Sequence, residues 1–228
     1  EDHAEYAKRA GYYKHYFDQS INFVRPKLSD GSWLTPYDPA RSVHGGTGSY
    51  FCEGNGWQYT FFVPQDVYGL IELFGGDKPF LERLNQFFVN NDSMGEEASA
   101  DITGLIGQYA HGNEPSHHIS YMYAYAGQQW KTAEKVRYIM DEFYKDTPDG
   151  IIGNEDCGQM SAWYILSSMG FYQMNPADGV YVFGSPRFDK MSVKVRGGKT
   201  FTVEAENNSK ENIYIQKVFL NGKPYKKT

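Results

Sequence analysis

Three short segments place acidic side chains beside glycines, each directly before an apolar stretch. They read CEGNGWQY (residues 52–59), HGNEPSHH (111–118) and GNEDCGQMSAWY (153–164). Carboxylates held at such positions can give and take protons from a bound substrate. Three acid-bearing, glycine-punctuated helix starts therefore predict one shared carbohydrate-like pocket.

Glu53 and Asp156 are the candidate catalytic acids of these segments. A general acid needs a partly desolvated carboxyl that keeps its proton near neutral pH, and aromatic neighbours such as Trp57 could exclude water from Glu53. Asp156 ends the run Asn154-Glu155-Asp156, in which adjacent acids repel, so solubility alone does not explain them. Structural alternatives stay open: Glu53 could interact with a helix dipole, and Asp156 could cap a helix.

The segment 111–118 offers possible metal ligands. His117 and His118 are adjacent and would leave a helix on different faces, which disfavours a zinc site. The oxygens of Asn113 and Glu114 suit a hard cation such as calcium better. An ordinary helix start at Pro115 is the structural alternative.

The composition excludes several classes of protein. A formal net charge of −6 with scattered Lys and Arg argues against nucleic acid as a partner, and no apolar run is long enough to span a bilayer. The residues given carry no signal-peptide pattern. The 19 Tyr, 15 Phe and 4 Trp suit sugar binding or an aromatic core. Whether Cys52 and Cys157 are bonded stays open.

The periodicity predicts a mainly α fold with an appended antiparallel β region. Helices are expected at residues 5–18, 59–73, 79–89, 117–126, 132–143 and 159–169, and strands at 180–183, 191–195, 200–204, 213–215 and 218–220. Turns are expected at 196–199 and at Asn221-Gly222. The domain prediction is a helical domain over 1–172 and a small β region over 173–228. The unpaired last strand suggests that the natural chain continues.

Taken together, the segments 53–66, 112–118, 127–132 and 153–172 resemble glycoside hydrolase family 92. The resemblance runs in order over most of residues 1–183. It implies an (α/α)6 barrel (α/α toroid) preceded by a β-sandwich, a calcium cofactor, and cleavage of terminal α-mannose with inversion. Such enzymes are typical of bacteria that feed on glycans, which implies a periplasmic, outer-surface or secreted location.

The resemblance also implies roles for individual residues. Glu53 matches the general acid and Asp156 the general base, which an inverting reaction holds about 6.5–9.5 Å apart. Asn113 and Glu114 fall in the calcium region. The expected substrate-binding residues are Glu114, His117, His118, Trp57 and Asn154. Many members have Asp at the position of Asn154, so the base role rests on Asp156 alone.

Family members are several times longer than this chain, so the resemblance implies a fragment. The six helices would form about half of a twelve-helix barrel, which predicts association with the missing N-terminal half or with a second copy, and little activity of the fragment alone. The expected substrate is a mannose-containing glycan, with α-1,2 linkages the first expectation. A non-catalytic carbohydrate-binding module and a purely structural helical module are the alternatives; only the former would bind sugar.

Overall fold

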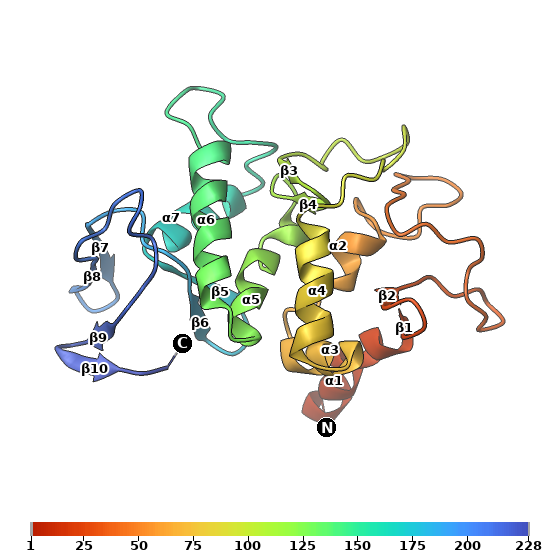
Figure 1. The fold of residues 1–228 in the computed structure, drawn as a ribbon, viewed down its shortest axis with the longest axis horizontal. Coiled ribbons are helices and arrows are strands. Elements are labelled where there is room, and N and C mark those ends of the chain that lie inside the picture. The colour runs from red at the N-terminus through yellow and green to blue at the C-terminus, as the bar shows by residue number, and fades with distance from the viewer. Residues whose placement is uncertain (1, 228) are drawn as a thin grey trace. The chain divides into compact units, whose positions relative to one another are not determined.

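The computed structural model describes residues 2–227, which divide into two compact units (Figure 1). The first unit extends to Ile119 and includes Ile152–Asn154. The second unit comprises Ser120–Ile151 and the chain from Glu155 onward.

The first unit contains four α-helices and two small hairpins among its described residues. The helices are α1 (Asp2–Ala10), α2 (Gly56–Thr60), α3 (Val67–Phe74) and α4 (Asp77–Phe87), with 3₁₀ turns at η1 (Tyr12–His15) and η2 (Glu114–Ser116). Strands β1 (Phe17–Asp18) and β2 (Phe23–Val24) pair antiparallel, as do β3 (Leu105–Ile106) and β4 (Tyr109–Ala110). The long stretch between β2 and α2 is irregular.

Two helices predicted from periodicity are interrupted in the first unit. The helix expected at 5–18 ends at Ala10, and the chain then forms η1 and enters β1, where the Tyr16 carbonyl accepts a hydrogen bond from Arg25 N at 2.8 Å. The helix expected at 59–73 is split into α2 and α3. Pro64 lacks an N–H for the helical ladder, and the Asp66 side chain caps α3 by accepting from Gly69 N at 3.0 Å.

An aromatic cluster fills the core of the first unit. Phe61 stacks on Phe74 with ring centroids 6.1 Å apart, and it meets Phe80 edge-on at 6.0 Å and Phe87 at 5.2 Å. All four side chains are buried. Because Phe61 follows α2 directly, this cluster packs the end of α2 against α3 and α4.

The second unit contains three α-helices among its described residues: α5 (Met122–Tyr125), α6 (Gln129–Phe143) and α7 (Gln159–Ser168), with η3 (Ile119–Tyr121) before α5. Its core includes the stacked pair Tyr144 and Trp163, with centroids 6.0 Å apart. The helix predicted at 117–126 is wrong over its first half, where a turn at His117 and His118 and then η3 replace it. Residues 113–118 are instead drawn into side-chain to backbone hydrogen bonds described below.

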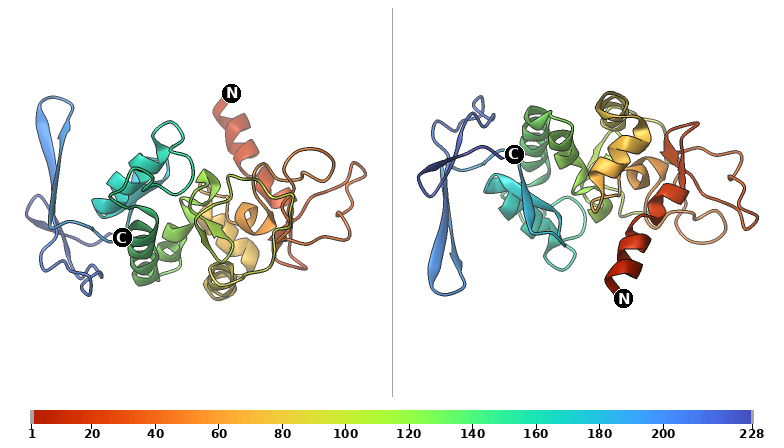
Figure 2. Two further views of the ribbon diagram at one scale, coloured as in Figure 1. Left: turned by 90° about the horizontal axis from the view of Figure 1, so that it is seen from above. Right: turned by 90° about the horizontal axis from the view of Figure 1, so that it is seen from below.

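The remaining strands form three separate two-stranded antiparallel sheets. They are β5 (Phe171–Asn175) with β6 (Val180–Phe183), β7 (Lys190–Val195) with β8 (Lys199–Glu204), and β9 (Val218–Leu220) with β10 (Lys223–Tyr225). Hairpin β7–β8 is the longest ribbon of the three (Figure 2). The turns expected at 196–199 and at Asn221-Gly222 connect β7 to β8 and β9 to β10.

One predicted strand does not form, and one strand was not predicted. Residues 213–215 are irregular because their polar groups bond elsewhere: the Ile213 carbonyl accepts from Ser185 Oγ at 2.6 Å, and Tyr214 Oη donates to Glu134 at 2.7 Å. Strand β5 was missed, although Phe171 pairs with Phe183 and Tyr172 with Val182. The fold is helical with small antiparallel sheets. None of the helices within residues 2–227 is long and apolar enough to cross a membrane.

Candidate active site

The backbone of Glu53 is held in a conformation that a non-glycine residue rarely adopts. Its φ is +41°, which costs about 1–2 kcal/mol for an L-residue. The Glu53 carbonyl accepts a hydrogen bond from Asn113 Nδ2 at 2.6 Å. The carbonyls before and after it are bonded as well, one to Tyr59 Oη at 2.8 Å and the other to Ser42 Oγ at 2.8 Å. Three side chains from different segments thus fix this loop.

Helix α2 begins with a capping box that the sequence analysis missed. Asn55 Oδ1 accepts from Gln58 N, and Gln58 Oε1 accepts from Asn55 N, both at 3.1 Å. The same two side chains reach Gln108, because Asn55 Nδ2 donates to Gln108 Oε1 at 2.8 Å and Gln58 Nε2 donates to the Gln108 carbonyl at 3.0 Å. The spacing Asn-x-x-Gln ahead of an apolar run is a visible signal for this cap.

Two glycines allow the loops 111–114 and 152–154 to touch. A Cβ on Gly153 would lie 3.0 Å from Gly112 Cα and 2.8 Å from Thr103 Oγ1, and a Cβ on Gly112 would overlap Thr103 Oγ1. Beside them, Asn154 Nδ2 donates to Asp101 Oδ1 at 3.3 Å. The first unit therefore brings Asn154 to the same loops as Asn113, and Asn113 to the backbone of Glu53.

Asp156 lies in the second unit, in a loop with left-handed backbone. The φ values of Asp156, Cys157 and Gly158 are +52°, +58° and +93°. The Asp156 carboxylate is exposed and forms no hydrogen bond or ion pair with any residue in the described range 2–227. A substrate or water could therefore use both of its oxygens.

Glu155, not Asp156, anchors the start of α7. Its Oε2 accepts from Gly158 N at 2.5 Å and its Oε1 accepts from Ser161 N at 3.2 Å. Hydrogen bonds from Ser161, followed by that from Gly158, lower the pKa of Glu155. The helix-cap alternative for Asp156 is therefore wrong.

His117 and His118 are buried rather than presented to solvent, with 2% and 5% of their surfaces exposed. His117 Nε2 donates to the His111 carbonyl at 2.8 Å, and His118 Nε2 donates to the Phe61 carbonyl at 2.7 Å. Burial lowers the pKa of each imidazole to about 4, so both rings are neutral at pH 7. These contacts fit residues that hold the 111–118 segment in place; direct sugar contact by either ring stays a prediction.

Trp57 is also a core residue. Its ring meets Phe23 edge-on with centroids 4.7 Å apart, and the Arg83 guanidinium lies 5.4 Å from its ring centroid. Its Nε1 is buried without a hydrogen-bond partner in the described chain. A substrate contact by Trp57 stays a prediction.

Asn113 and Glu114, the predicted calcium ligands, are neighbours at the start of η2. Asn113 Oδ1 is buried without a partner among the described residues, and the carboxylate of Glu114 follows it in η2. Both oxygens are of the kind that calcium prefers, but calcium takes six to eight of them. No group of three His, Cys, Asp or Glu side chains able to hold a metal occurs within residues 2–227. Asn113 and Glu114 therefore offer two of the oxygens that a calcium site would need.

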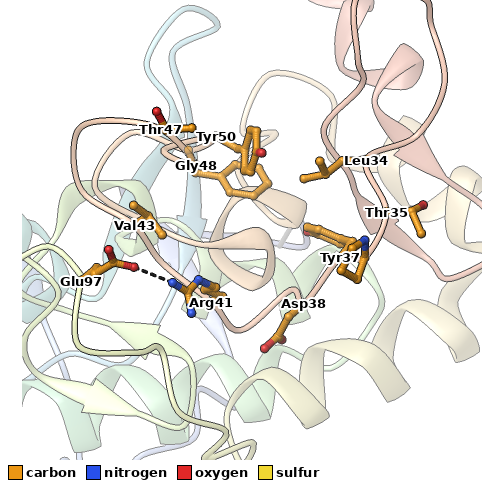
Figure 3. Close-up of a pocket in the computed structure, with 13 residues that line it drawn as sticks. Leu34, Thr35, Tyr37, Asp38, Arg41, Val43, Thr47, Gly48, Tyr50 and Glu97 are labelled. Atoms are coloured by element: carbon orange, nitrogen blue, oxygen red, sulfur yellow. Dashed lines mark hydrogen bonds and ion pairs between the residues drawn. The ribbon is translucent and has the colours of Figure 1, made fainter.

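A cavity of about 440 Å³ lies beside the Glu53 loop, in the first unit (Figure 3). Phe51 and Gly54, which flank Cys52 and Glu53, are among its lining residues. The other lining residues are Leu34, Thr35, Pro36, Tyr37, Asp38, Arg41, Val43, Thr47, Gly48, Tyr50 and Glu97. The walls of the cavity come mostly from an irregular stretch without periodicity, so no sequence pattern predicts it.

Cys52 and Cys157 are both free and exposed.

The chain is similar to known proteins in sequence and in fold. The model of the glycosyl hydrolase family 92 catalytic domain matches residues 1–228, so the chain belongs to this family of glycoside hydrolases. An uncharacterized secreted glycosidase of Arthroderma benhamiae is 31% identical over 98% of this chain and 30% of its own length.

Two solved structures from Bacteroides thetaiotaomicron are similar in fold and sequence. A family GH92 α-mannosidase in complex with mannoimidazole matches 93% of this chain and 28% of its own, with 39% identity and a TM-score of 0.87. A family GH92 inverting mannosidase matches 97% and 30%, with 36% identity and a TM-score of 0.81. The chain thus spans less than a third of the length of these relatives.

Proposed function

We propose that this chain is part of an exo-acting α-mannosidase that removes terminal mannose from glycans with inversion. The observation that carries the proposal is the backbone of Glu53, an acid kept at positive φ by three hydrogen bonds to the carbonyls around it. Strain of this kind persists where the surroundings over-determine it, typically at functional sites. Similarity to an α-mannosidase and to an inverting mannosidase supports the substrate and stereochemistry.

Glu53 is the general acid of this proposal and Asp156 is the general base. The Glu53 carboxyl gives its proton to the departing glycosidic oxygen. The Asp156 carboxylate takes a proton from the water that attacks the anomeric carbon from the opposite face. An exposed carboxylate without protein partners suits the second role, because both of its oxygens remain available. Asn154, held by Asp101, would not share the base role because an amide cannot accept the proton.

Calcium is the proposed cofactor, with Asn113 Oδ1 and the Glu114 carboxylate among its ligands. A bound calcium ion would contact sugar hydroxyls and favour a flattened ring. The remaining ligands, the rest of an (α/α)6 barrel and the rest of the sugar pocket would come from the part of the enzyme outside this chain. We therefore propose that these 228 residues alone have little activity. We also propose that the enzyme cleaves α-1,2 linkages and that it is exported.

The test uses the full-length enzyme with a terminal α-mannoside whose leaving group is varied. Glu53→Gln should lower kcat/KM by about 10²–10⁴-fold on an alkyl or sugar leaving group, but far less on a dinitrophenyl leaving group, which departs without a proton. Asp156→Asn should lower kcat/KM equally on both kinds of substrate. Asp149 is an exposed acid on another loop, and Asp149→Asn should leave kcat/KM unchanged on both. Proton NMR should show β-mannose as the first product. An unaltered rate in Asp156→Asn would remove the base assignment, and sugar binding without hydrolysis would favour a carbohydrate-binding module.

A further inference from the structure

One wall of the cavity beside the Glu53 loop packs against the helix that follows the acid. Trp57 N, in helix α2, donates to the Pro39 carbonyl at 3.2 Å, and a Cβ on Gly56 would overlap the Tyr37 hydroxyl. Tyr37 Oη in turn donates to the Val24 carbonyl at 2.7 Å. The wall that contains Tyr37 is therefore packed against the first turn of α2.

The opposite wall is fixed to the same loop. Ser42 Oγ donates to the Gly54 carbonyl at 2.8 Å, and Ser42 N donates to the Met94 carbonyl at 2.9 Å. His44 N donates to the Glu97 carbonyl at 2.9 Å, and the Glu97 carboxylate accepts from Arg41 Nη2 at 2.5 Å. Figure 3 shows Leu34 and Thr35 on one side of the cavity and Val43 and Thr47 on the other, with this ion pair at one edge.

The lining combines aromatic rings with paired hydrogen-bonding groups. Tyr50 is 54% exposed and lines the cavity together with Tyr37 and Phe51. Aromatic faces pack on the apolar faces of pyranose rings, and the Arg41–Glu97 pair offers donors and acceptors side by side, as two neighbouring sugar hydroxyls require. The volume of about 440 Å³ falls within the usual range of ligand pockets.

The charges of the lining favour a neutral ligand. Arg41 is the cation of the lining residues, while Asp38 and Glu97 are both acids. An anionic group would meet a net negative surface, since the Glu97 carboxylate already occupies the Arg41 guanidinium.

We propose that this cavity binds the leaving-group side of a neutral glycan, that is, the sugar rings next to the mannose that is removed. This inference rests on the proposed function. A general acid must lie within hydrogen-bond distance of the glycosidic oxygen, so the next ring lies beside the acid. The cavity shares the loop of Glu53, through Phe51 and Gly54. Arg41 and Glu97 hold ring hydroxyls, and Tyr50 supports a ring face.

Binding to a full-length enzyme with Glu53→Gln tests the cavity apart from catalysis. By calorimetry, Arg41→Ala in this background should weaken mannotriose binding about tenfold, the loss of one charge-assisted hydrogen bond, while mannose binding stays the same. Tyr50→Ala should act similarly and Tyr50→Phe should retain affinity. Lys190→Ala is the matched control, because Lys190 forms an equally exposed ion pair with Glu204.

Several outcomes would overturn the inference. Unchanged mannotriose affinity in both Arg41→Ala and Tyr50→Ala removes the site, and Glu97→Gln serves as a second variant where Arg41→Ala is poorly folded. Equal losses for mannose and mannotriose place Arg41 at the terminal-mannose site instead. Tighter binding of a phosphorylated or sulfated trisaccharide contradicts a neutral ligand. Failure of the proposed function is separate: it shows as absent hydrolysis by the unsubstituted enzyme, whatever the binding result.

Discussion

Replacing Asn113 by Asp changes one hydrogen bond at the Glu53 loop while keeping the shape of the side chain. Asn113 Nδ2 donates to the Glu53 carbonyl at 2.6 Å, and a carboxylate at the same place can only accept. The three side-chain bonds around Glu53 contribute about 1 kcal/mol each. They oppose about 1.5 kcal/mol of left-handed backbone cost, which leaves a margin of roughly 1.5 kcal/mol for the observed loop.

Asn113→Asp removes about 1 kcal/mol and adds about 2 kcal/mol for two buried acceptors facing each other. The margin then becomes roughly −1.5 kcal/mol, so the population of the observed loop falls from over 90% to under 10%. Asn113→Ala removes only the hydrogen bond, about 1 kcal/mol, so the observed loop remains the major conformation. We therefore expect the ratio of the rates on an alkyl and a dinitrophenyl α-mannoside, which reports the acid, to fall about tenfold in Asn113→Asp and less than about twofold in Asn113→Ala. Loss of the proposed calcium ligand Oδ1 in Asn113→Ala should lower kcat/KM on both substrates equally, so it does not alter this ratio.

The assay compares an alkyl α-mannoside with a dinitrophenyl α-mannoside in the full-length enzyme at saturating calcium. Because Asn113→Asp acts through the acid, the loss should be confined to the alkyl substrate, whose leaving group needs the proton of Glu53. A larger fall of the alkyl-to-dinitrophenyl rate ratio in Asn113→Ala than in Asn113→Asp would refute the role of the hydrogen bond from Asn113 Nδ2. A fall in kcat/KM on both substrates in Asn113→Ala would come from the loss of its oxygen, as expected of the proposed calcium ligand.

Two further predictions concern stability. Thr103→Val should raise the free energy of unfolding by about 1 kcal/mol, because the buried Thr103 hydroxyl has no partner among the described residues. Thr103→Ser keeps the hydroxyl and should not raise it. A lower urea midpoint in Thr103→Val would contradict this prediction. Stability should also fall between pH 6.5 and about 4, because His117 and His118 have a lower pKa in the folded protein than when unfolded. The unfolded chain takes up their protons first, at a cost of about 3 kcal/mol for each. His118→Gln, which can still donate to the Phe61 carbonyl, should flatten this pH dependence in urea titrations, and an unchanged slope would show that His118 does not cause it.

The helices with an unbroken apolar period were predictable from the sequence. The expectation of 79–89 lies within two residues of α4 at both ends, and 159–169 lies within one residue of α7. Periodicity failed where polar side chains bond to a distant backbone. His118 bonds to the Phe61 carbonyl across 57 residues, and the segment around it forms 3₁₀ turns instead of the expected helix.

The candidate site shows the same division. The acidic residues could be found by type and by their glycine neighbours, whereas the groups that hold them could not. Asn113 bonds to Glu53 across 60 residues, and no local pattern marks that partnership. A local signal was available for the Asn55–Gln58 capping box, because both residues stand at fixed spacing before the helix.

Glu155 and Asp156, the adjacent acids of the 153–164 segment, have two different roles that a single carboxylate could not combine. A carboxylate that caps α7 must point both oxygens at backbone N–H groups, as Glu155 does toward Gly158 and Ser161. Those bonds hold the Glu155 charge and lower its pKa, which makes it a poor proton acceptor. Because Glu155 satisfies the helix start, Asp156 keeps its oxygens for solvent or substrate. The left-handed backbone at Asp156 and Cys157 then follows from a chain that must turn between the capping acid and the helix it caps.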